Sequence, residues 1–346
     1  MGSSSYTNWL ARYEWLAGVK LMPDSLIRIA VRAALKSRLK QQGTVAKSNS
    51  LKVSFADDPI AVETSKANRQ HYEVPTEFFG LILGPRLKYS SAFWPDFDTD
   101  LASAEDAMLE TMAERAALED GQRILDLGSG WGAFSIWAAQ RYSRSEITAI
   151  SNSRTQEEFI RSRAATLKLT NLTVMRRDVA SLDLGIDGRF DRIVSVEMLE
   201  HIRNAGPVLD YLSQILERRG CIFAHVFSHM KHTYTFEIED GWMAKWFFSG
   251  GMMPNIDHYD SQITTLKTVK RWVLNGQHYA RTLRAWLCNL DMNREAVLGI
   301  FREFYGPKDC LLWVARWRLF LIACEELFAY QGGREWVVVH HLFEPV

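Results

Sequence analysis

With 346 residues, 47% of them apolar, and a formal net charge of zero, the chain is long enough for a large packed core. The balanced charge gives no electrostatic reason to expect nucleic-acid binding. The four cysteines are scattered and lack metal-ligand spacing, so we expect a reducing, cytoplasmic setting, no disulfide framework and no metal site. The apolar run 311–324 is too short to cross a bilayer.

The first predicted element is a basic helix. Asp24 is a suitable N-cap and Gly43 a suitable stop, so we expect a helix from about residue 24 to residue 42. One side is apolar, and the other carries five basic residues: Arg28, Arg32, Lys36, Arg38 and Lys40. The basic side indicates either docking to anionic lipid head groups or an ordinary solvated face, and we favour the second.

Two aromatic-rich segments follow, at residues 68–79 and 88–94. Ordinary loops rarely contain so many large rings, so we interpret these segments as part of a lid over a pocket, with packing against the sheet as the alternative for each ring. We divide the chain into a helical cap at residues 1–100 and a core at 101–346, with a substrate-covering insertion at about 228–265.

The core alternates helix and strand. A helix over residues 102–118 precedes strands at 123–127, 146–150, 172–176, 190–196 and 221–226, and two later strands are expected at 268–274 and 335–343. Helical stretches between strands imply parallel pairing with right-handed crossovers. This pattern predicts an α/β fold, namely a doubly wound, seven-stranded, mostly parallel sheet with an antiparallel edge, whose ligands bind at the carboxyl ends of the strands.

The strongest single motif follows the first core strand. Asp126 ends that strand, and Gly128, Gly130 and Gly132 come at alternate positions before a helical stretch. Glycine permits positive φ and lets a ligand approach the bare backbone, so this corner predicts a nucleotide-type ligand. The alternative is a tight turn that binds nothing.

The next two strand ends refine the expected ligand. Asn152 and Gln156 follow the second strand, where a nicotinamide-binding sheet would have an acid, and neutral groups of this kind can hold a ribose. Asp178 follows the third strand. It can accept a hydrogen bond from an adenine amine while Val179 packs on the ring, or else simply cap a helix.

The fourth strand leads into Glu197, with Glu200 and His201 close behind. If a helix begins there, these three side chains project to one side. Two carboxylates and an imidazole are costly to bury without a task, and they suit a cationic reactant and a proton transfer. The alternative is an exposed first helical turn, where acids are favourable anyway.

Seven motifs occur in the order found in one enzyme family: His71-Tyr72-Glu73-Val74-Pro75, Leu87-Lys88-Tyr89-Ser90-Ser91, the glycine turn, Ser151-Asn152-Ser153, Glu197 to His201, Phe247 to Pro254, and Asn275 to Tyr279. On these motifs, which span nearly all of residues 60–345, the chain resembles the cyclopropane-fatty-acid-synthase-like family of S-adenosylmethionine-dependent methyltransferases. It is most similar to the coclaurine N-methyltransferase branch. The resemblance implies a Rossmann-like class I methyltransferase fold, with S-adenosylmethionine as cofactor and S-adenosylhomocysteine as its product.

The resemblance also implies roles for individual residues. The family's cofactor contacts match Ser90, Gly128, Asn152, Gln156, Asp178 and Val179, to which the glycine turn adds Asp126 and Gly130. Its catalytic pair matches Glu200 and His201, with Glu197 beside them. Its substrate pocket matches Tyr72 and Glu73.

The cyclopropane synthases of this family differ at one position. A cysteine there, at the position of Ser91, helps to hold a bicarbonate that serves as base. Two further bicarbonate positions match His225 and Tyr279, which we also place on the substrate side. We interpret Cys324, near a late cysteine of the synthases, as a buried structural thiol.

We therefore expect methyl transfer to the nitrogen of a small, alkaloid-like amine, with Glu200 or His201 accepting the proton and Glu197 and Glu73 holding the cationic nitrogen. One alternative is cyclopropane formation on unsaturated phospholipids, with the basic helix docking peripherally on lipid, and Ser91 counts against it. Another is a non-enzymatic nucleoside-binding module. We expect no integral membrane segment and allow for a homodimer.

Overall fold

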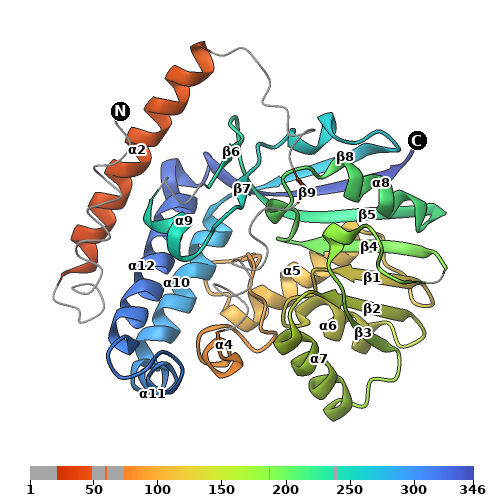
Figure 1. Cartoon of the computed structure of the whole chain (residues 1–346), viewed down its shortest axis with the longest axis horizontal. Helices are drawn as coiled ribbons and strands as arrows, with labels where there is room; N and C mark the ends of the chain where they lie inside the picture. The colour runs from red at the N-terminus through yellow and green to blue at the C-terminus, as the bar shows by residue number, and fades with distance from the viewer. Residues whose placement is uncertain (1–21, 49–58, 61–73, 187, 237–240) are drawn as a thin grey trace.

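The computed structural model describes residues 22–48, 59–60, 74–186, 188–236 and 241–346. Its centre is a seven-stranded sheet in the order β3-β2-β1-β4-β5-β9-β8 (Figure 1). Three strands have the predicted bounds: β1 (Arg123–Leu127), β3 (Leu172–Arg176) and β4 (Phe190–Val196). The other four differ from prediction by one to five residues at an end: β2 (Glu146–Ser151), β5 (Leu216–His229), β8 (Leu266–Leu274) and β9 (Trp336–Pro345). The predicted seven-stranded sheet is confirmed.

The antiparallel strand does not lie at the edge. β9 runs antiparallel to both of its neighbours, β5 and β8, and lies between them. Along the chain, β8 comes first and forms the edge of the sheet. Three helices follow it, and β9 then lies between β8 and β5. The expected antiparallel edge is therefore one position inside the sheet.

Helices cover both faces of the sheet, as a doubly wound fold requires. Ile124 packs in the same core as α5 (Leu101–Arg115), whereas Leu125 and Leu127 pack in the core that contains α8 (Gly206–Gln214). Successive residues of β1 thus enter opposite cores, which is the alternation of a strand buried on both faces. Two further helices follow β1 and β2, namely α6 (Ala133–Arg141) and α7 (Arg154–Thr166).

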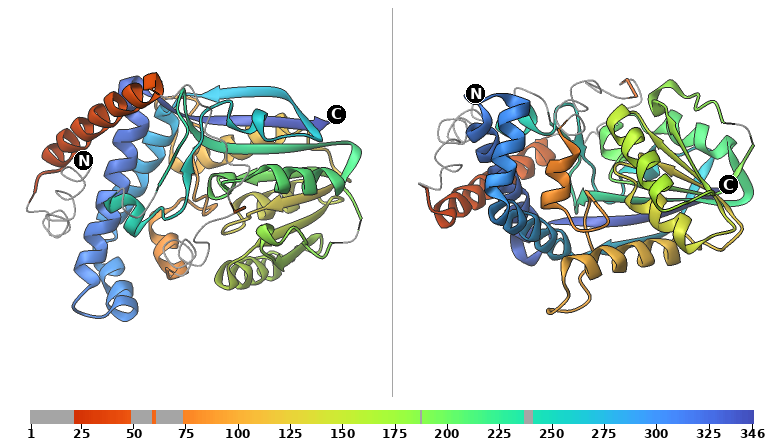
Figure 2. Two further views of the ribbon diagram at one scale, coloured as in Figure 1. Left: turned by 45° about the horizontal axis from the view of Figure 1, so that its top comes forward. Right: turned by 90° about the horizontal axis from the view of Figure 1, so that it is seen from below.

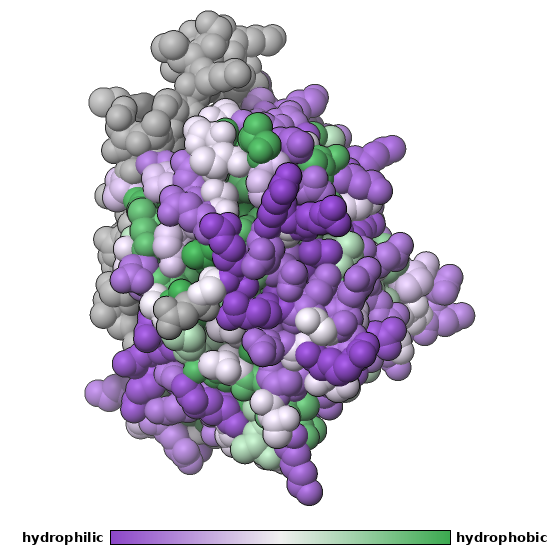
Figure 3. Space-filling model, turned by 90° about the vertical axis from the view of Figure 1, so that its right-hand side faces the viewer, coloured by the Kyte–Doolittle hydropathy of each residue, from purple (hydrophilic) through white to green (hydrophobic). Residues whose placement is uncertain are grey.

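A second group of helices lies beyond one end of the sheet: α4 (Thr76–Ile82), α10 (Gln277–Met292), α11 (Arg294–Tyr305) and α12 (Cys310–Ala329) (Figures 1 and 2). The carboxyl ends of β4 and β5 face this group, because Glu197 and Phe227 share a cavity wall with residues of α10 and α12. The side of the molecule on which the chain ends is mostly hydrophilic, with scattered apolar residues (Figure 3).

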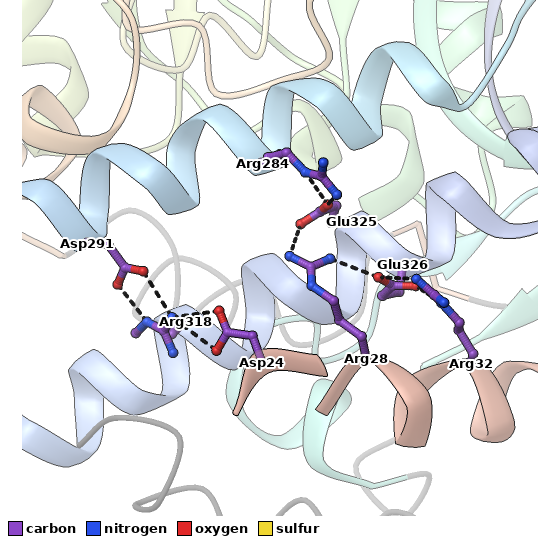
Figure 4. Close-up of polar contacts among 8 residues, drawn as sticks. All are labelled: Asp24, Arg28, Arg32, Arg284, Asp291, Arg318, Glu325 and Glu326. Carbon is purple, nitrogen blue, oxygen red and sulfur yellow. Dashed lines mark hydrogen bonds and ion pairs between the residues drawn. The ribbon is translucent and has the colours of Figure 1, made fainter. Parts of the chain in front are cut away.

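The basic helix α2 (Asp24–Ser48) packs along α12 (Figure 1). The expected stop at Gly43 is wrong, since a glycine costs a helix only about 1 kcal/mol and does not forbid it. The favoured solvated face is also wrong in part. Arg28 donates to Glu325 at 2.7 Å and to Glu326 at 2.8 Å, and Arg32 contacts Glu326 (Figure 4). These acids lie almost 300 residues away in the chain, so the sequence pattern could not reveal them.

No helix in the described part of the chain combines the length and apolar character needed to cross a bilayer. The α12 sequence comes nearest in apolar content, but Arg316 and Arg318 lie within it and both are buried against protein. Arg318 donates to Asp291 and Asp24 (Figure 4). These charges therefore belong to the packing of α12 against its neighbours.

Candidate active site

Two cavities meet at the carboxyl ends of the strands. The first, which we name the glycine-turn cavity, has a volume of about 1230 Å³ when its open mouth is included. The second, the aromatic cavity, measures about 900 Å³ in the same way. Every residue predicted to contact the cofactor lines the glycine-turn cavity: Ser90, Asp126, Gly128, Gly130, Asn152, Gln156, Asp178 and Val179.

The glycine turn has the backbone that its sequence predicts. Gly128, Gly130 and Gly132 all have positive φ, at +82°, +52° and +79°. A Cβ on Gly128 would lie 2.7 Å from the Cγ of Met198, whereas one on Gly130 would meet nothing within 4 Å. Because Gly130 lines the cavity, its bare backbone is open to a ligand.

Three buried polar atoms of residues in this cavity wall have no hydrogen-bond partner among the described residues. Asp126 is buried, and its Oδ2 finds no hydrogen bond among the described residues, nor do Gln156 Nε2 and Trp131 Nε1. A buried polar group left in this way costs about 1–3 kcal/mol. Asp178 Oδ1 does accept from Ala180 N, at 2.9 Å, so the expected cap and the expected cavity position both hold. The cavity thus offers donors and an acceptor that a polar ligand can satisfy.

The aromatic cavity is built largely by two helices and the segment after β5. α10 and α12 contribute side chains at intervals of three and four, which places them on one side of each helix: Tyr279, Leu283, Trp286, Phe320, Ala323, Cys324, Leu327 and Phe328. The segment from residue 228 to residue 265 adds Phe236, Met243, Phe248 and Met253. The same spacing in a sequence is also typical of core packing, so sequence reasoning did not separate these residues from the core.

Cys324 departs from expectation. It is only partly buried and lies in the wall of the aromatic cavity, so the expectation of a buried thiol is wrong. Burial raises the pKa of its thiol to about 12, which keeps the sulfur protonated and therefore unreactive.

Three residues line both cavities: Tyr89, Glu197 and His201. The Glu197 carboxylate accepts from Ser91 N at 2.9 Å and from the Tyr279 hydroxyl at 2.6 Å, and His225 Nε2 lies 3.2 Å from it. Burial raises the pKa of Glu197, and the nearby charge of Lys88 acts in the opposite direction. A buried carboxylate is thus fixed where the two cavities join.

Glu200 does not share the side of Glu197 and His201, so the expectation of one common face is wrong. Glu197 has a φ of +47°, and the following turn, η3 (Leu199–His201), is a short 3-10 helix. Glu200 is buried outside both cavity walls and accepts from Phe227 N at 2.7 Å. The irregular backbone at Glu197 explains the difference, because the α-helical spacing behind the expectation does not apply there.

The remaining predicted residues have mixed positions. Tyr72 and Glu73 lie outside the described residues. Tyr279 lines the aromatic cavity, while His225 is fully buried behind Glu197 and lines neither cavity. The sequence predicts no separate role for Lys88, yet this residue lines the glycine-turn cavity and donates to Ser90 Oγ at 2.5 Å.

Comparison with known proteins decides the family. Residues 61–337 match the family model described as mycolic acid cyclopropane synthetase. The chain belongs to this family. Over 336 residues it is 32% identical to (S)-coclaurine N-methyltransferase from Thalictrum flavum subsp. glaucum, covering 94% of this chain and 92% of that protein. It is 30% identical to cyclopropane-fatty-acyl-phospholipid synthase from Escherichia coli (strain K12) over 220 residues, 63% of this chain and 54% of that one.

One solved structure has nearly the same fold as this chain. The crystal structure of coclaurine N-methyltransferase bound to N-methylheliamine and SAH superposes with a TM-score of 0.90 at 29% identity, covering 97% of this chain and 99% of that one. This chain is an S-adenosylmethionine-dependent methyltransferase. The predicted family, fold, enzyme class and cofactor are confirmed.

The glycine-turn cavity fits this cofactor. The unpartnered Asp126 Oδ2 and Gln156 Nε2 supply an acceptor and a donor, and Gly130 leaves room at the backbone. When bound, the cofactor supplies a methyl group on a positively charged sulfur. Three carboxyl groups of the described residues lie in the wall of this cavity, those of Asp126, Asp178 and Glu197.

We expect Gly130→Val to lose cofactor affinity by roughly tenfold or more, because a branched side chain at this positive φ costs about 1–2 kcal/mol and projects toward the ligand. Calorimetric titration with S-adenosylhomocysteine measures the loss. Gly306→Val is the matched control, since Gly306 also has a positive φ, a Cβ there also meets nothing within 4 Å, and Gly306 is in neither cavity wall. Equal affinity in both variants would mean that the cofactor lies elsewhere.

We also expect cofactor affinity to depend on pH through Asp126. Burial raises its pKa to about 7, and a cationic ligand lowers that pKa because it favours the carboxylate. Binding S-adenosylmethionine then releases a proton, so affinity is full above pH 7 and falls below it by up to about tenfold per pH unit. Titrations over a pH series should show this slope in the wild type and lose it in Asp126→Asn. The same slope in both proteins would contradict the assignment.

Proposed function

We propose that this enzyme transfers a methyl group from S-adenosylmethionine to the nitrogen of a small aromatic, alkaloid-like amine held in the aromatic cavity. The observation that carries the proposal is the Glu197 carboxylate, which lies where the two cavities meet and is surrounded by rings. A buried negative charge among aromatic faces favours a cationic acceptor, because both the carboxylate and the rings attract it. The named activity of the coclaurine relative is consistent with this proposal.

The reaction is an in-line displacement. The acceptor nitrogen forms a bond to the methyl carbon while the carbon–sulfur bond breaks, and the electron pair stays on sulfur. An amine is protonated near neutral pH and must lose that proton before its lone pair can attack. The enzyme therefore has to position the nitrogen and remove a proton.

His201 is suited to accept that proton. It lines both cavities, and burial lowers its pKa to about 4, so its imidazole is neutral at physiological pH. A neutral imidazole can take the proton directly or through one water. Burial makes this imidazole a weak base, and the charge of Glu197, which raises the pKa of His201, opposes that effect. Glu197, kept in place by its donors, holds the cationic nitrogen meanwhile.

We assign Glu200 a positioning role rather than a direct one. Its carboxyl lies behind the cavity wall and accepts from the backbone N–H of Phe227, whose ring lines the aromatic cavity. Burial, followed by the proximity of Glu197, raises the pKa of Glu200 well above its usual value. Because Glu200 lines neither cavity, Glu197 is the carboxyl group of this pair that faces the acceptor.

The contacts of Glu197 favour an amine over a lipid acceptor. The three positions that resemblance links to a bicarbonate are Ser91, His225 and Tyr279, and all three contact the Glu197 carboxylate. Glu197 thus already contacts all three positions, and at one of them Ser91 stands in place of the cysteine that helps the synthases to hold bicarbonate. We infer that the reaction needs no bicarbonate.

Other expectations stay predictions. These are the helical cap at residues 1–100, the substrate-covering role of residues 228–265, the cytoplasmic location and the homodimer. The contribution of Phe236 and Phe248 to the aromatic cavity supports a covering role for the second segment. The use of Arg28 and Arg32 in internal ion pairs argues against the peripheral lipid contact.

The test is a screen with a radiolabelled methyl group on the cofactor. Benzylisoquinoline-like, phenethylamine-like and β-carboline-like amines are compared with vesicles of unsaturated phospholipid, each with and without added bicarbonate. We expect label in an amine, none in lipid, and no bicarbonate dependence. Label in phospholipid that rises with bicarbonate would overturn the proposal in favour of cyclopropane formation.

We expect His201→Ala to lower kcat by about a hundredfold or more, the usual contribution of a positioned base, while the Kd of the cofactor stays close to that of the wild type. Glu197→Gln should instead raise the KM for the amine, because it removes the charge. His258→Ala is the control, since His258 is buried but lines neither cavity. Parallel loss of kcat and cofactor affinity in His201→Ala would assign that residue a structural role.

A further inference from the structure

Four side chains form a row of hydrogen-bonded contacts from Glu197 to Arg115, at the end of α5. His225 Nε2 lies 3.2 Å from Glu197 Oε1, His340 Nε2 lies 2.9 Å from His225 Nδ1, and Arg115 Nη1 lies 2.7 Å from His340 Nδ1. Both histidines are fully buried, whereas Arg115 is partly exposed at the end of α5. None of the steps of methyl transfer described above uses His340 or Arg115.

The chemistry of arginine fixes the direction of this row of hydrogen bonds. A guanidinium only donates hydrogen bonds, so His340 Nδ1 must accept from Arg115. A neutral His340 then carries its proton on Nε2 and donates it to His225 Nδ1. His225 in turn carries its proton on Nε2, which points at Glu197. Every hydrogen bond is therefore directed toward the carboxylate.

Burial supports neutral imidazoles in both places. It lowers the pKa of His225 and of His340 well below the usual value, and nearby Lys88 and Arg115 add to the effect. A doubly protonated His225 would also place its Nδ1–H against the Nε2–H of His340. The row therefore cannot carry a proton away from Glu197, because every acceptor nitrogen in it is already occupied.

We propose that Arg115 and His340 are positioning residues for the methyl transfer, which act through His225 to orient Glu197 and keep it a hydrogen-bond acceptor. This proposal rests on the proposed function, in which Glu197 holds the acceptor nitrogen. The register of the sheet supports it, since His225 on β5 pairs directly with His340 on β9. The Arg115 guanidinium also stacks over the Trp272 ring, at 5.0 Å, which restrains its outer end.

Other titratable groups face the same row and stay unchanged in the variants below. Those around Glu197 are Lys88, Glu200, His201, Tyr279 and Cys324. Those around His340 and Arg115 are Lys88, His341 and Glu114. A change in the behaviour of Glu197 can therefore be assigned to the substituted link only by comparison with matched controls.

The controls come from an equivalent pair on the same strands. His341 follows His340 on β9 and is equally buried, and its Nδ1 contacts Arg271 rather than Arg115. Arg271 leads to Asp257 and Asp260, not to Glu197. His341→Leu and Arg271→Leu thus test for general damage to this edge of the sheet.

The experiment measures kcat/KM for the accepted amine against pH. In Arg115→Leu and His340→Leu the hydrogen bonds of this row are no longer fixed in direction. His225 can then adopt the other tautomer, in which its Nε2 carries no proton toward Glu197. We expect the acid limb of the profile to move upward by on the order of one pH unit, with cofactor Kd unchanged. Arg115→Lys and His340→Gln, which retain a donor, should keep the limb near the wild-type position, as should both controls.

An unmoved acid limb in both leucine variants, or an equal shift in His341→Leu, would overturn the proposal. If His340→Leu does not fold, Arg115→Leu and Arg115→Lys still decide the question, because Arg115 lies at the partly exposed end.

Nitrogen-15 NMR of the histidine rings tests the hydrogen-bond directions without turnover. We expect Nε2–H tautomers at His225 and His340, and an Nδ1–H tautomer at either would refute it. Failure of the wild type to methylate any amine would instead overturn the proposed function and leave the tautomers unaffected.

Discussion

The site depends on one buried carboxylate, that of Glu197, which must stay charged and fixed in position. Burying an unpaired ionised carboxylate is costly, and here the cost is offset by donors from separate parts of the chain. Ser91 donates from the loop before α5, Tyr279 from α10 and His225 from β5. Glu197 also holds a φ of +47°, a conformation that a non-glycine residue adopts only when its surroundings require it. Each cavity obtains its shape from elements that converge on this residue.

The topology of the sheet makes this convergence physically simple. Glu197 directly follows β4, whose last residue, Val196, pairs with His225 on the neighbouring β5. The antiparallel β9 then lies between β5 and β8 rather than at the edge, which brings His340 against His225 from within the sheet. A strand added at the outer edge would have left His225 without this neighbour. The position of β9 therefore matters for the chemistry as well as for the fold.

Local patterns in the sequence predicted most of the fold, and tertiary contacts explain the rest. The strands, the glycine turn and the cofactor side follow from periodicity and from glycine at Gly128 and Gly130, which act within a few residues. The separation of Glu200 from His201 follows from one left-handed residue, Glu197, for which the sequence gives no signal. The pairing of Arg28 with Glu325, and of His340 with Arg115, joins residues that are far apart in sequence. No pattern of spacing could have revealed such pairs.

Methyl transfer also moves a charge, and the position of Glu197 suits that movement. The reaction starts with a positive sulfur in the glycine-turn cavity and a neutral nitrogen in the aromatic cavity, and it ends with a neutral sulfur and a positive nitrogen. A carboxylate at the junction of the two cavities attracts the charge at both ends of this movement, and the larger set of aromatic faces on the acceptor side adds attraction for the positive nitrogen. Stabilisation that grows toward the transition state raises kcat, whereas equal stabilisation of both ends does not. The aromatic faces of the acceptor side therefore supply the part of the attraction that grows during the reaction, while the carboxylate at the junction serves both ends.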